Sequence, residues 1–447
     1  MSNNLDFLRL NDALPGDIAR RKAMGDLAGA IRLIDARLAA GLQPELAPRL
    51  RVERMRLERL PDDYPYTRAQ ALEQIRSEWP ACTEAQFDAL VDGGRIDWRC
   101  VDGEPHYHDR LLECLRLYPQ EAPGLRREED PGRAERDAVL ERMEAEGGLT
   151  ARITVRASIR ARAAAPGAEV QAWLPIPAAC PQQSEIEILD ATPGGLCAPE
   201  DAPQRTIWWK SRTCADFFVT YRYLHHAAWV DPLTLIPDPV QPEFDLEEQA
   251  PHIVFTPYLR ALAARLTQGC RGPVEKAKAI YDYITGFVDY RYQPAYIQLD
   301  CIADRCAKEL RGDCGVMALL FITLCRIAGI PARWQSGLSV RPGHVGSHDW
   351  AMFYIVPHGW LWADCSFGSS ARRMGEEKHR RHYFGNLDPW RMVANRAFFA
   401  PLTPPDRAWR NDPFDNQSGE LSVDGRGLAA KEREIRQELV EFELLDA

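Results

Sequence analysis

The sequence predicts an α+β protein built from three successive kinds of region. Residues 1–123 show helical periodicity, residues 149–245 alternate apolar and polar side chains at the period of a strand, and residues 250–403 mix both patterns. At roughly 150 residues per domain, a chain of 447 residues has room for about three domains. We therefore expect a helical N-terminal domain, a β-rich domain and a mixed core.

The composition is that of an ordinary globular protein, with 45% hydrophobic and 27% charged residues. A net charge of -10 argues against a nucleic-acid partner, because such proteins usually carry a basic surface. The first residues contain early acids and no apolar stretch typical of a secretory signal, and no apolar run approaches the ~20 residues of a membrane span. We expect no membrane association and a cytoplasmic location.

The 12 cysteines stand singly along the chain and favour free thiols over a disulfide framework. No Cys-x-x-Cys pair occurs, and the spacing of Cys301 and Cys306 is not that of a zinc knuckle. His106 and His108 have only single cysteines nearby, so a surface hairpin is the better interpretation there. We expect neither a metal nor a cofactor.

The N-terminal 123 residues are expected to be mostly helical. Residues 17–42 carry apolar side chains at helical spacing, and Thr67 is a suitable N-cap for a helix that continues to residue 79. Residues 83–118 predict a helix, a short hairpin and a second helix. The role of this domain stays open, although helical segments of this kind often bind a protein partner.

The charged residues 124–148 predict a linker followed by a solvated helix. From residue 149 a period-two pattern begins, and its interruption at Pro166-Gly167 indicates a hairpin. Aromatic and β-branched residues continue the strand signal through 206–226. Residues 149–245 are therefore expected to form the β-rich domain.

In the core, residues 256–270 and 274–292 predict amphipathic helices, and an apolar helix begins at Cys314 and stops near Gly329. Residues 348–356 and 359–364 predict two strands joined by a short turn. Residues 404–447 are expected to form a polar tail that ends in a helix over 431–445.

The start of the apolar helix is the first candidate for chemistry. Asp313 can cap this helix, which places Cys314 in the first turn, where backbone N–H groups lack partners. The helix dipole favours an anion there, so we expect the Cys314 thiol to ionise more easily than a free cysteine. An ordinary helix-start cysteine remains the alternative.

A thiolate nucleophile needs a base and a group that orients the base. His348 stands at the entry to one predicted strand, and Asp364 ends the next. If the two strands form a hairpin, these side chains lie within reach of each other across the ladder. His344 lies in the same loop and competes for the role of base.

These residues occur in blocks that resemble the transglutaminase-like (papain-like thiol) superfamily, in its bacterial form. The blocks are Gly-Asp-Cys at 312–314, Ala-Gly-Ile-Pro-Ala-Arg at 328–333, His-x-Trp at 348–350, and Gly-Trp at 359–360 followed by Asp364. They cover residues 250 to 370, about a quarter of the chain. The β-rich segment resembles a domain that often precedes this core in bacterial members.

The resemblance implies a core in which the helix bearing the cysteine packs on an antiparallel sheet. It implies Cys314 as the nucleophile, His348 as general base and acid, and Asp364 as the residue that orients the histidine. Arg333 and Trp350 would be framework residues.

The resemblance also implies a thioacyl intermediate on the cysteine. The missing Cys-x-x-Cys pairs disfavour the peptide:N-glycanase branch, and the missing C-terminal β-domains disfavour the animal crosslinking enzymes. What remains is a cysteine-dependent hydrolase, a peptidase or amidase, acting on an amide or peptide bond of a peptide or protein substrate. Hydrolysis is favoured because transfer to an amine needs a site that excludes water. Amine transfer and a non-catalytic interaction scaffold are the alternatives.

The oxyanion of the intermediate needs hydrogen-bond donors, and the backbone N–H of Cys314 is one. In the superfamily a second donor often comes from a side chain upstream of the cysteine, and Tyr292 and Gln293 are favoured over Tyr290. The basic run at 378–382 is a solvated face or, as an alternative, a site for an acidic group of the substrate.

Overall fold

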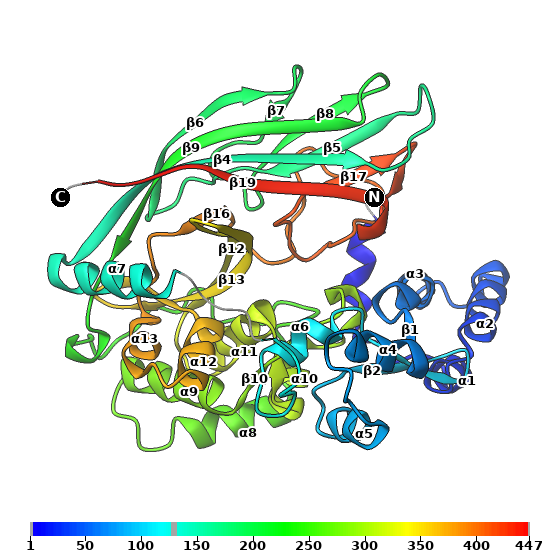
Figure 1. The fold of residues 1–447 in the computed structure, drawn as a ribbon, viewed down its shortest axis with the longest axis horizontal. Coiled ribbons are helices and arrows are strands. Elements are labelled where there is room, and N and C mark those ends of the chain that lie inside the picture. The colour runs from blue at the N-terminus through cyan, green and yellow to red at the C-terminus, as the bar shows by residue number, and fades with distance from the viewer. Residues whose placement is uncertain (1–2, 127–131, 446–447) are drawn as a thin grey trace. The chain divides into compact units, whose positions relative to one another are not determined.

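The computed structural model describes residues 3–126 and 132–445, which divide into two compact units. The small unit contains residues 5–126 and 290–301, and the large unit contains residues 132–289 and 302–445 together with Asn4. Figure 1 shows the course of the chain. Residues 127–131, in the predicted charged linker, lie outside the described residues.

The small unit is mostly helical, as predicted. Its helices are α1 (Gly16–Ala23), α2 (Leu27–Ala40), α3 (Ala47–Asp63), α4 (Arg68–Glu78), α5 (Glu84–Asp92) and α6 (Leu111–Arg116), with the 3-10 helices η1 (Asn3–Arg9), whose first residues precede the unit, and η3 (Tyr296–Gln298). The strands β1 (Tyr66–Thr67), β2 (Trp98–Val101) and β3 (Glu104–Tyr107) form a sheet in the order β1-β3-β2. Thr67 caps α4 through a capping box, which confirms the predicted N-cap.

The predicted helix, hairpin and helix over 83–118 are confirmed as α5, the β2–β3 hairpin and α6. Residues 290–301 join this unit through hydrogen bonds to it. The Tyr118 hydroxyl donates to the Tyr290 carbonyl at 2.8 Å, and Arg56 Nη2 donates to the Gln298 carbonyl at 2.8 Å.

The core sheet of the large unit has five antiparallel strands in the order β15-β14-β13-β12-β16. They are β12 (Ala332–Arg341), β13 (His344–Ile355), β14 (Gly359–Ala363), β15 (Phe384–Gly385) and β16 (Arg391–Asn395). The β13–β14 pairing confirms the predicted hairpin through Pro357.

Helices cover one side of this sheet (Figure 1). They are α8 (Pro257–Leu266), α9 (Pro273–Phe287), α10 (Ile302–Glu309), α11 (Cys314–Ile327), α12 (Cys365–Arg373) and α13 (Glu377–His382); the short elements are β10 (Asp289–Tyr290), β11 (Arg311–Gly312) and η2 (Pro232–Thr234). Helix α11 is almost entirely buried and packs on β13, because its sequence is apolar on every face.

The β-rich region forms two further sheets, in the orders β18-β17-β5-β8-β7 and β19-β4-β9-β6. The strands are β4 (Gly148–Ala161), β5 (Val170–Pro175), β6 (Gln183–Ala191), β7 (Leu196–Cys197), β8 (Thr206–Ser211), β9 (Asp216–Ala228), β17 (Glu420–Val423), β18 (Arg426–Gly427) and β19 (Arg433–Leu445). The inner faces of both sheets and the β12 and β16 strands share one hydrophobic cluster, so the β-rich region and the core belong to one unit.

The predicted C-terminal helix is wrong: residues 433–445 form strand β19, which pairs with β4 along its length. The apolar positions of this segment fit both a helical and a strand period. Strand pairing prevails because the ladder satisfies the β4 edge and places Ile435, Leu439, Phe442 and Leu444 against the cluster. A bulge between Leu439 and Glu441 keeps the later apolar residues on that face.

The segment expected to be a polar tail, which begins at residue 404, is also folded. Strands β17 and β18 arise from it, and Phe414, Asp415 and Glu420 are buried. The helix expected after the linker is present as α7 (Arg133–Glu146), but one of its faces is buried through Val139, Leu140 and Met143.

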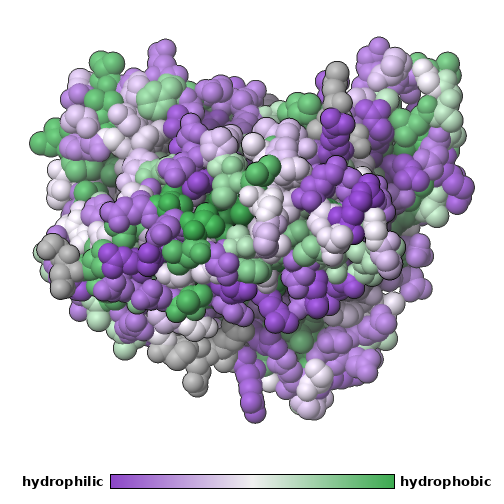
Figure 2. Space-filling view, turned by 90° about the horizontal axis from the view of Figure 1, so that it is seen from above, coloured by the Kyte–Doolittle hydropathy of each residue, from purple (hydrophilic) through white to green (hydrophobic). Residues whose placement is uncertain are grey.

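Over residues 3–126 and 132–445, no helix has both the length and the hydropathy needed to cross a bilayer. Hydrophilic and hydrophobic residues interleave on the face drawn in Figure 2.

Candidate active site

Cys314 is the first residue of α11, as the sequence predicts. Asp313 precedes it and accepts a hydrogen bond from the Val316 backbone N–H at 3.1 Å, which confirms the predicted cap. The glycine at 312 permits a close approach, because a Cβ there would lie 2.5 Å from Val316 Cγ1. The local sequence therefore fixes the direction in which the helix begins and the place of its first thiol.

His348 and Asp364 lie together, in a buried pair. The Nε2 atom of His348 is 2.7 Å from Oδ2 of Asp364, and the two side chains come from β13 and from the residue after β14. Oδ1 of Asp364 also accepts hydrogen bonds from Ser366 Oγ at 3.0 Å and from the Phe367 N–H at 2.9 Å. Asp364 therefore both orients the histidine and caps α12.

The charge state of this pair follows from its neighbours. Burial opposes ionisation of Asp364, but His348 and Arg391 outweigh it and hold the pKa of this carboxyl well below its usual range. An ionised Asp364 requires the proton of a neutral imidazole to sit on Nε2, which leaves Nδ1 as the basic nitrogen. Within the described residues Nδ1 has no hydrogen-bond partner, and the ring stacks on Phe367 with centroids 4.3 Å apart.

Arg391 extends the pair into a buried chain of charges that the sequence analysis missed. Its Nη2 lies 3.0 Å from Oδ2 of Asp364 and 2.6 Å from Oδ2 of Asp388, and all three side chains are almost fully buried. Asp388 and Arg391 stand three residues apart in the sequence, but only the pairing of β16 with β12 brings them to Asp364.

The Cys314 thiol has a different partner, Asp349, which the sequence analysis also missed. Sγ lies 3.1 Å from Oδ2 of Asp349, and Oδ1 of Asp349 accepts a hydrogen bond from Gln417 Nε2 at 2.6 Å. A sequence signal for Asp349 existed: it occupies the strand face of Ala351 and Phe353, where a charge is out of place.

The expectation that Cys314 ionises easily is therefore wrong for this structure. Burial, followed by the carboxylates of Asp349 and Asp313, raises the pKa of the Cys314 thiol well above its usual value. These effects exceed the contribution of the helix dipole, which is modest and confined to the first turn.

The two pairs occupy opposite faces of β13. His348 shares a face with Trp350, whose Nε1 donates to Gln335 at 2.8 Å. Asp349 shares the other face with Phe353, which meets Phe321 of α11. The structure thus brings His348 to Asp364 and Cys314 to Asp349, and no hydrogen bond joins Cys314 to His348 among the described residues.

The two oxyanion candidates belong to the small unit. Gln293 Nε2 donates to the Arg291 carbonyl at 2.9 Å, and the Arg110 guanidinium lies 3.6 Å from the ring centroid of Tyr292. Their role as oxyanion donors stays a prediction, as does the choice of His348 over the exposed His344.

The basic run at 378–382 is largely engaged within the protein. Lys378 lies near Glu141 and Glu144, and His379 contacts Glu376 at 2.7 Å. Arg380 pairs with Asp282. Only part of this run is therefore solvated.

Residues 260–365 match the family model described as the transglutaminase-like superfamily, about a quarter of the chain. This match confirms the predicted resemblance. No curated protein matches the chain.

Three solved structures illustrate the likeness of the chain to known proteins. One is a candidate cysteine protease from Cytophaga hutchinsonii, at 15% identity and a TM-score of 0.39, over 67% of this chain and 90% of that one. The periplasmic domain of TgpA from Pseudomonas aeruginosa has 17% identity and a TM-score of 0.27, over 54% of this chain and 95% of that one. A candidate protease from Parabacteroides distasonis has 13% identity and a TM-score of 0.22, over 48% and 42%.

The protein is thus an α+β protein with a transglutaminase-like core. Cys314 and His348 lie within the matched residues, and so does Asp364.

Proposed function

We propose that the large unit is a cysteine-dependent hydrolase that cleaves an amide or peptide bond through a thioacyl intermediate. The observation that carries the proposal is the buried His348–Asp364 pair, which leaves Nδ1 of the imidazole unpaired. The pair lies within residues 260–365, which match the transglutaminase-like model and also contain the helix-start Cys314.

In the proposed reaction, Sγ of Cys314 forms a bond to the carbonyl carbon as its proton passes to Nδ1 of His348. The tetrahedral intermediate collapses when the C–N bond breaks and His348 returns that proton to the leaving amine. Water then attacks the thioester, gives up a proton to His348, and releases the acid and the free thiol. Asp364 keeps the imidazole oriented and stabilises its charged form.

This reaction requires the thiol to leave Asp349 and to meet Nδ1 of His348. The thiol is protonated at rest, so His348 must act as a base during the attack and not as the partner of a preformed thiolate. The Cys314 backbone N–H, in the first turn of α11, is the proposed oxyanion donor.

We favour hydrolysis over amine transfer because water needs no dedicated acceptor site. Incubating the acyl-enzyme with a primary amine such as methylamine separates the two reactions. A methylamide product in place of the free acid would identify a transferase.

The experiment for the proposed function is trapping of the acyl-enzyme with peptide p-nitroanilides or thioesters, followed by peptide mass spectrometry. We expect an adduct on Cys314 in the native chain and none in Cys314→Ala. His348→Ala should reduce the rate of acylation by about 10²-fold or more, as is typical for loss of a general base. Cys270→Ser, which alters a partly exposed thiol outside α11, is the matched control and should leave acylation unchanged. Acylation that persists in Cys314→Ala would refute the assignment.

A non-catalytic scaffold is the second candidate, favoured by the hydrogen bond that holds the thiol on Asp349. In that case no acyl adduct forms, and a protein partner of the full chain binds Cys314→Ala as tightly as the native protein. Binding through residues 1–123 and a cytoplasmic location are parts of our proposal that partner mapping on the full chain and cell fractionation would test.

A further inference from the structure

Asp349 sits at the junction between the nucleophile and the C-terminal segment. One of its oxygens faces the Cys314 sulfur and the other accepts from Gln417, at 3.1 and 2.6 Å. Burial raises the pKa of both the Asp349 and the Asp415 carboxyl, and the charge of Asp415 raises that of Asp349 further. Both side chains are almost fully buried, so solvent cannot easily replace these contacts.

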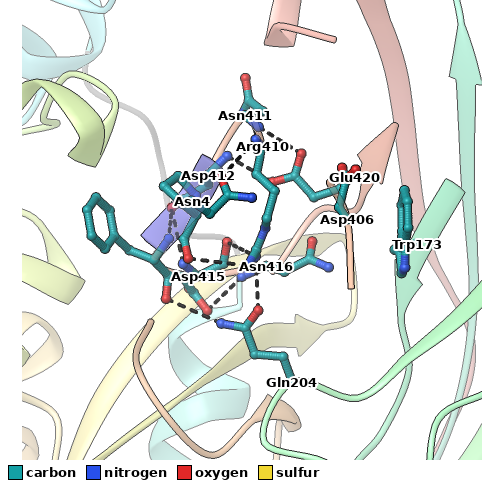
Figure 3. A network of polar contacts seen from close by, with 12 residues as sticks. Asn4, Trp173, Gln204, Asp406, Arg410, Asn411, Asp412, Asp415, Asn416 and Glu420 are labelled. Carbon is teal, nitrogen blue, oxygen red and sulfur yellow. Dashed lines mark hydrogen bonds and ion pairs between the residues drawn. The ribbon is translucent and has the colours of Figure 1, made fainter. Parts of the chain in front are cut away.

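Asp415 is itself fixed by several donors. Its Oδ1 accepts from Ser336 Oγ at 2.6 Å, from Asn395 Nδ2 at 2.7 Å and from the Asn416 N–H at 2.9 Å. Figure 3 shows Asp415 within a polar network that includes Arg410 and Asp412. Arg410 donates to Gln204 at 2.9 Å and to the Pro413 carbonyl at 3.2 Å.

We propose that Asp349 is the resting partner of the Cys314 nucleophile, and that residues 412–417 set the reactivity of this thiol by fixing the Asp349 carboxyl. The inference rests on the proposed function for its biological meaning, since it concerns the same sulfur. Its physical content, the effect of Asp349 on the thiol, does not depend on turnover.

The direction of the effect follows from charge. A carboxylate beside a thiol favours the S–H form, because the thiolate would be a second negative charge in a buried site. In the native chain burial and the neighbouring Asp415 raise the pKa of Asp349, so Asp349 carries less than a full charge. The ionisable and charged groups that act on this site come from α11, β13 and the C-terminal segment: Cys314, Asp313, Asp349, Asp415, Asp412 and Arg410.

The first test measures the rate at which iodoacetamide alkylates Cys314 in the Asp349→Asn variant between pH 6 and 9. Site-resolved mass spectrometry follows the reaction. The asparagine can still accept from Gln417, and its amide N–H can donate to a thiolate. We expect alkylation at pH 7 to become about tenfold faster, which corresponds to a fall of one unit in the thiol pKa. The control is Asp406→Asn, which neutralises a buried carboxyl outside residues 412–417 that accepts a hydrogen bond from the Ala408 N–H. It should change the rate less than twofold.

The second test uses a variant, Asp415→Asn, in which the alkylation of Cys314 should become slower. Asp415→Asn keeps an oxygen for its three donors and removes the neighbouring charge that raises the pKa of Asp349, so Asp349 ionises more readily. We expect alkylation of Cys314 to become at least about threefold slower, because the neighbouring charge increases. A general loosening of the site would instead accelerate alkylation in both variants.

Opposite changes in the two variants support the proposal, whereas unchanged rates or changes in the same direction overturn it. Far-UV circular dichroism and thermal melting identify any variant that fails to fold. If only one variant folds, the direction of its change in alkylation rate still tests the proposal. If the native chain forms no acyl-enzyme while the two rates shift in opposite directions, the proposed function fails and this inference stands. If acylation occurs and the two rates do not shift, the proposed function stands and this inference fails.

Discussion

At the scale of single residues, the site consists of two pairs of side chains that differ in charge: one holds an ionised carboxylate and the other favours protonated groups. In the His348–Asp364 pair the carboxylate is ionised, because the Arg391 guanidinium places a positive charge beside it. Cys314 and Asp349 favour their protonated forms, because the thiol is partly buried and the Asp349 carboxyl is almost fully buried, beside further carboxyls. The protein therefore holds an imidazole beside an ionised carboxylate on one face of a strand and a protonated thiol on the other.

Asp364→Asn should destabilise the protein at pH 7 by about 3 kcal/mol, since Arg391 and His348 lose the buried carboxylate that accepts from both of them. The pKa of Asp364 is lowered on folding, so its stabilisation is present above the unfolded value of 3.8 and is lost as the pH falls below it. Urea denaturation of the native protein and of Asp364→Asn at pH 7 and at pH 2.5 should show a smaller difference in the free energy of unfolding at the lower pH. A constant difference would argue against ionised Asp364.

At the scale of elements, the C-terminal strand shows how context decides between helix and strand. Residues 431–445 have apolar positions compatible with both periods, and the sequence analysis chose a helix. The long, regular edge of β4 offers backbone partners along the whole segment, which an isolated helix would not use. Phe442 then stacks near Trp390, with ring centroids 6.3 Å apart.

Phe442→Ala should lower the free energy of unfolding by about 2 kcal/mol, the lower part of the range for aromatic truncations, because the ring is only half-buried. Val440→Ala is the matched control: its side chain is 59% exposed, so the loss should be under about 0.5 kcal/mol. Urea melts followed by circular dichroism measure both. Equal losses would contradict the strand arrangement.

At the scale of the large unit, the β-rich strands and the core sheet share one hydrophobic cluster. Leu338 and Val340 of β12 contribute to it together with Ile153 of β4 and Leu174 of β5. The sequence boundary near residue 245 therefore separates two patterns of residues but not two hydrophobic cores.

A shared core predicts cooperative unfolding of these two parts. Leu338→Ala removes a fully buried side chain and should destabilise the unit by about 3 kcal/mol. Native-state hydrogen exchange should show the same loss of protection for slowly exchanging amides in β4 and β9 as in β13 and β14. Loss confined to β12–β14 would mean that the parts unfold separately.

Much of the fold and part of the site could be predicted from local sequence. Helix α11 and its cap at Asp313, the β13–β14 hairpin and the α5–hairpin–α6 segment all depend on neighbours a few residues away. The closeness of His348 and Asp364 followed from that hairpin alone. The role of β19 could not be predicted, because its partner β4 lies far away in the sequence.

What the sequence determined by itself was the place of Cys314, His348 and Asp364 along local elements, because caps and short turns obey short-range rules. The tertiary structure alone decided how these groups are charged. Asp349, Asp415, Gln417 and Arg391 reach the site through strand pairing and a distant segment. Electrostatic effects in a buried site depend on every charge within a few ångströms, whatever its distance along the chain.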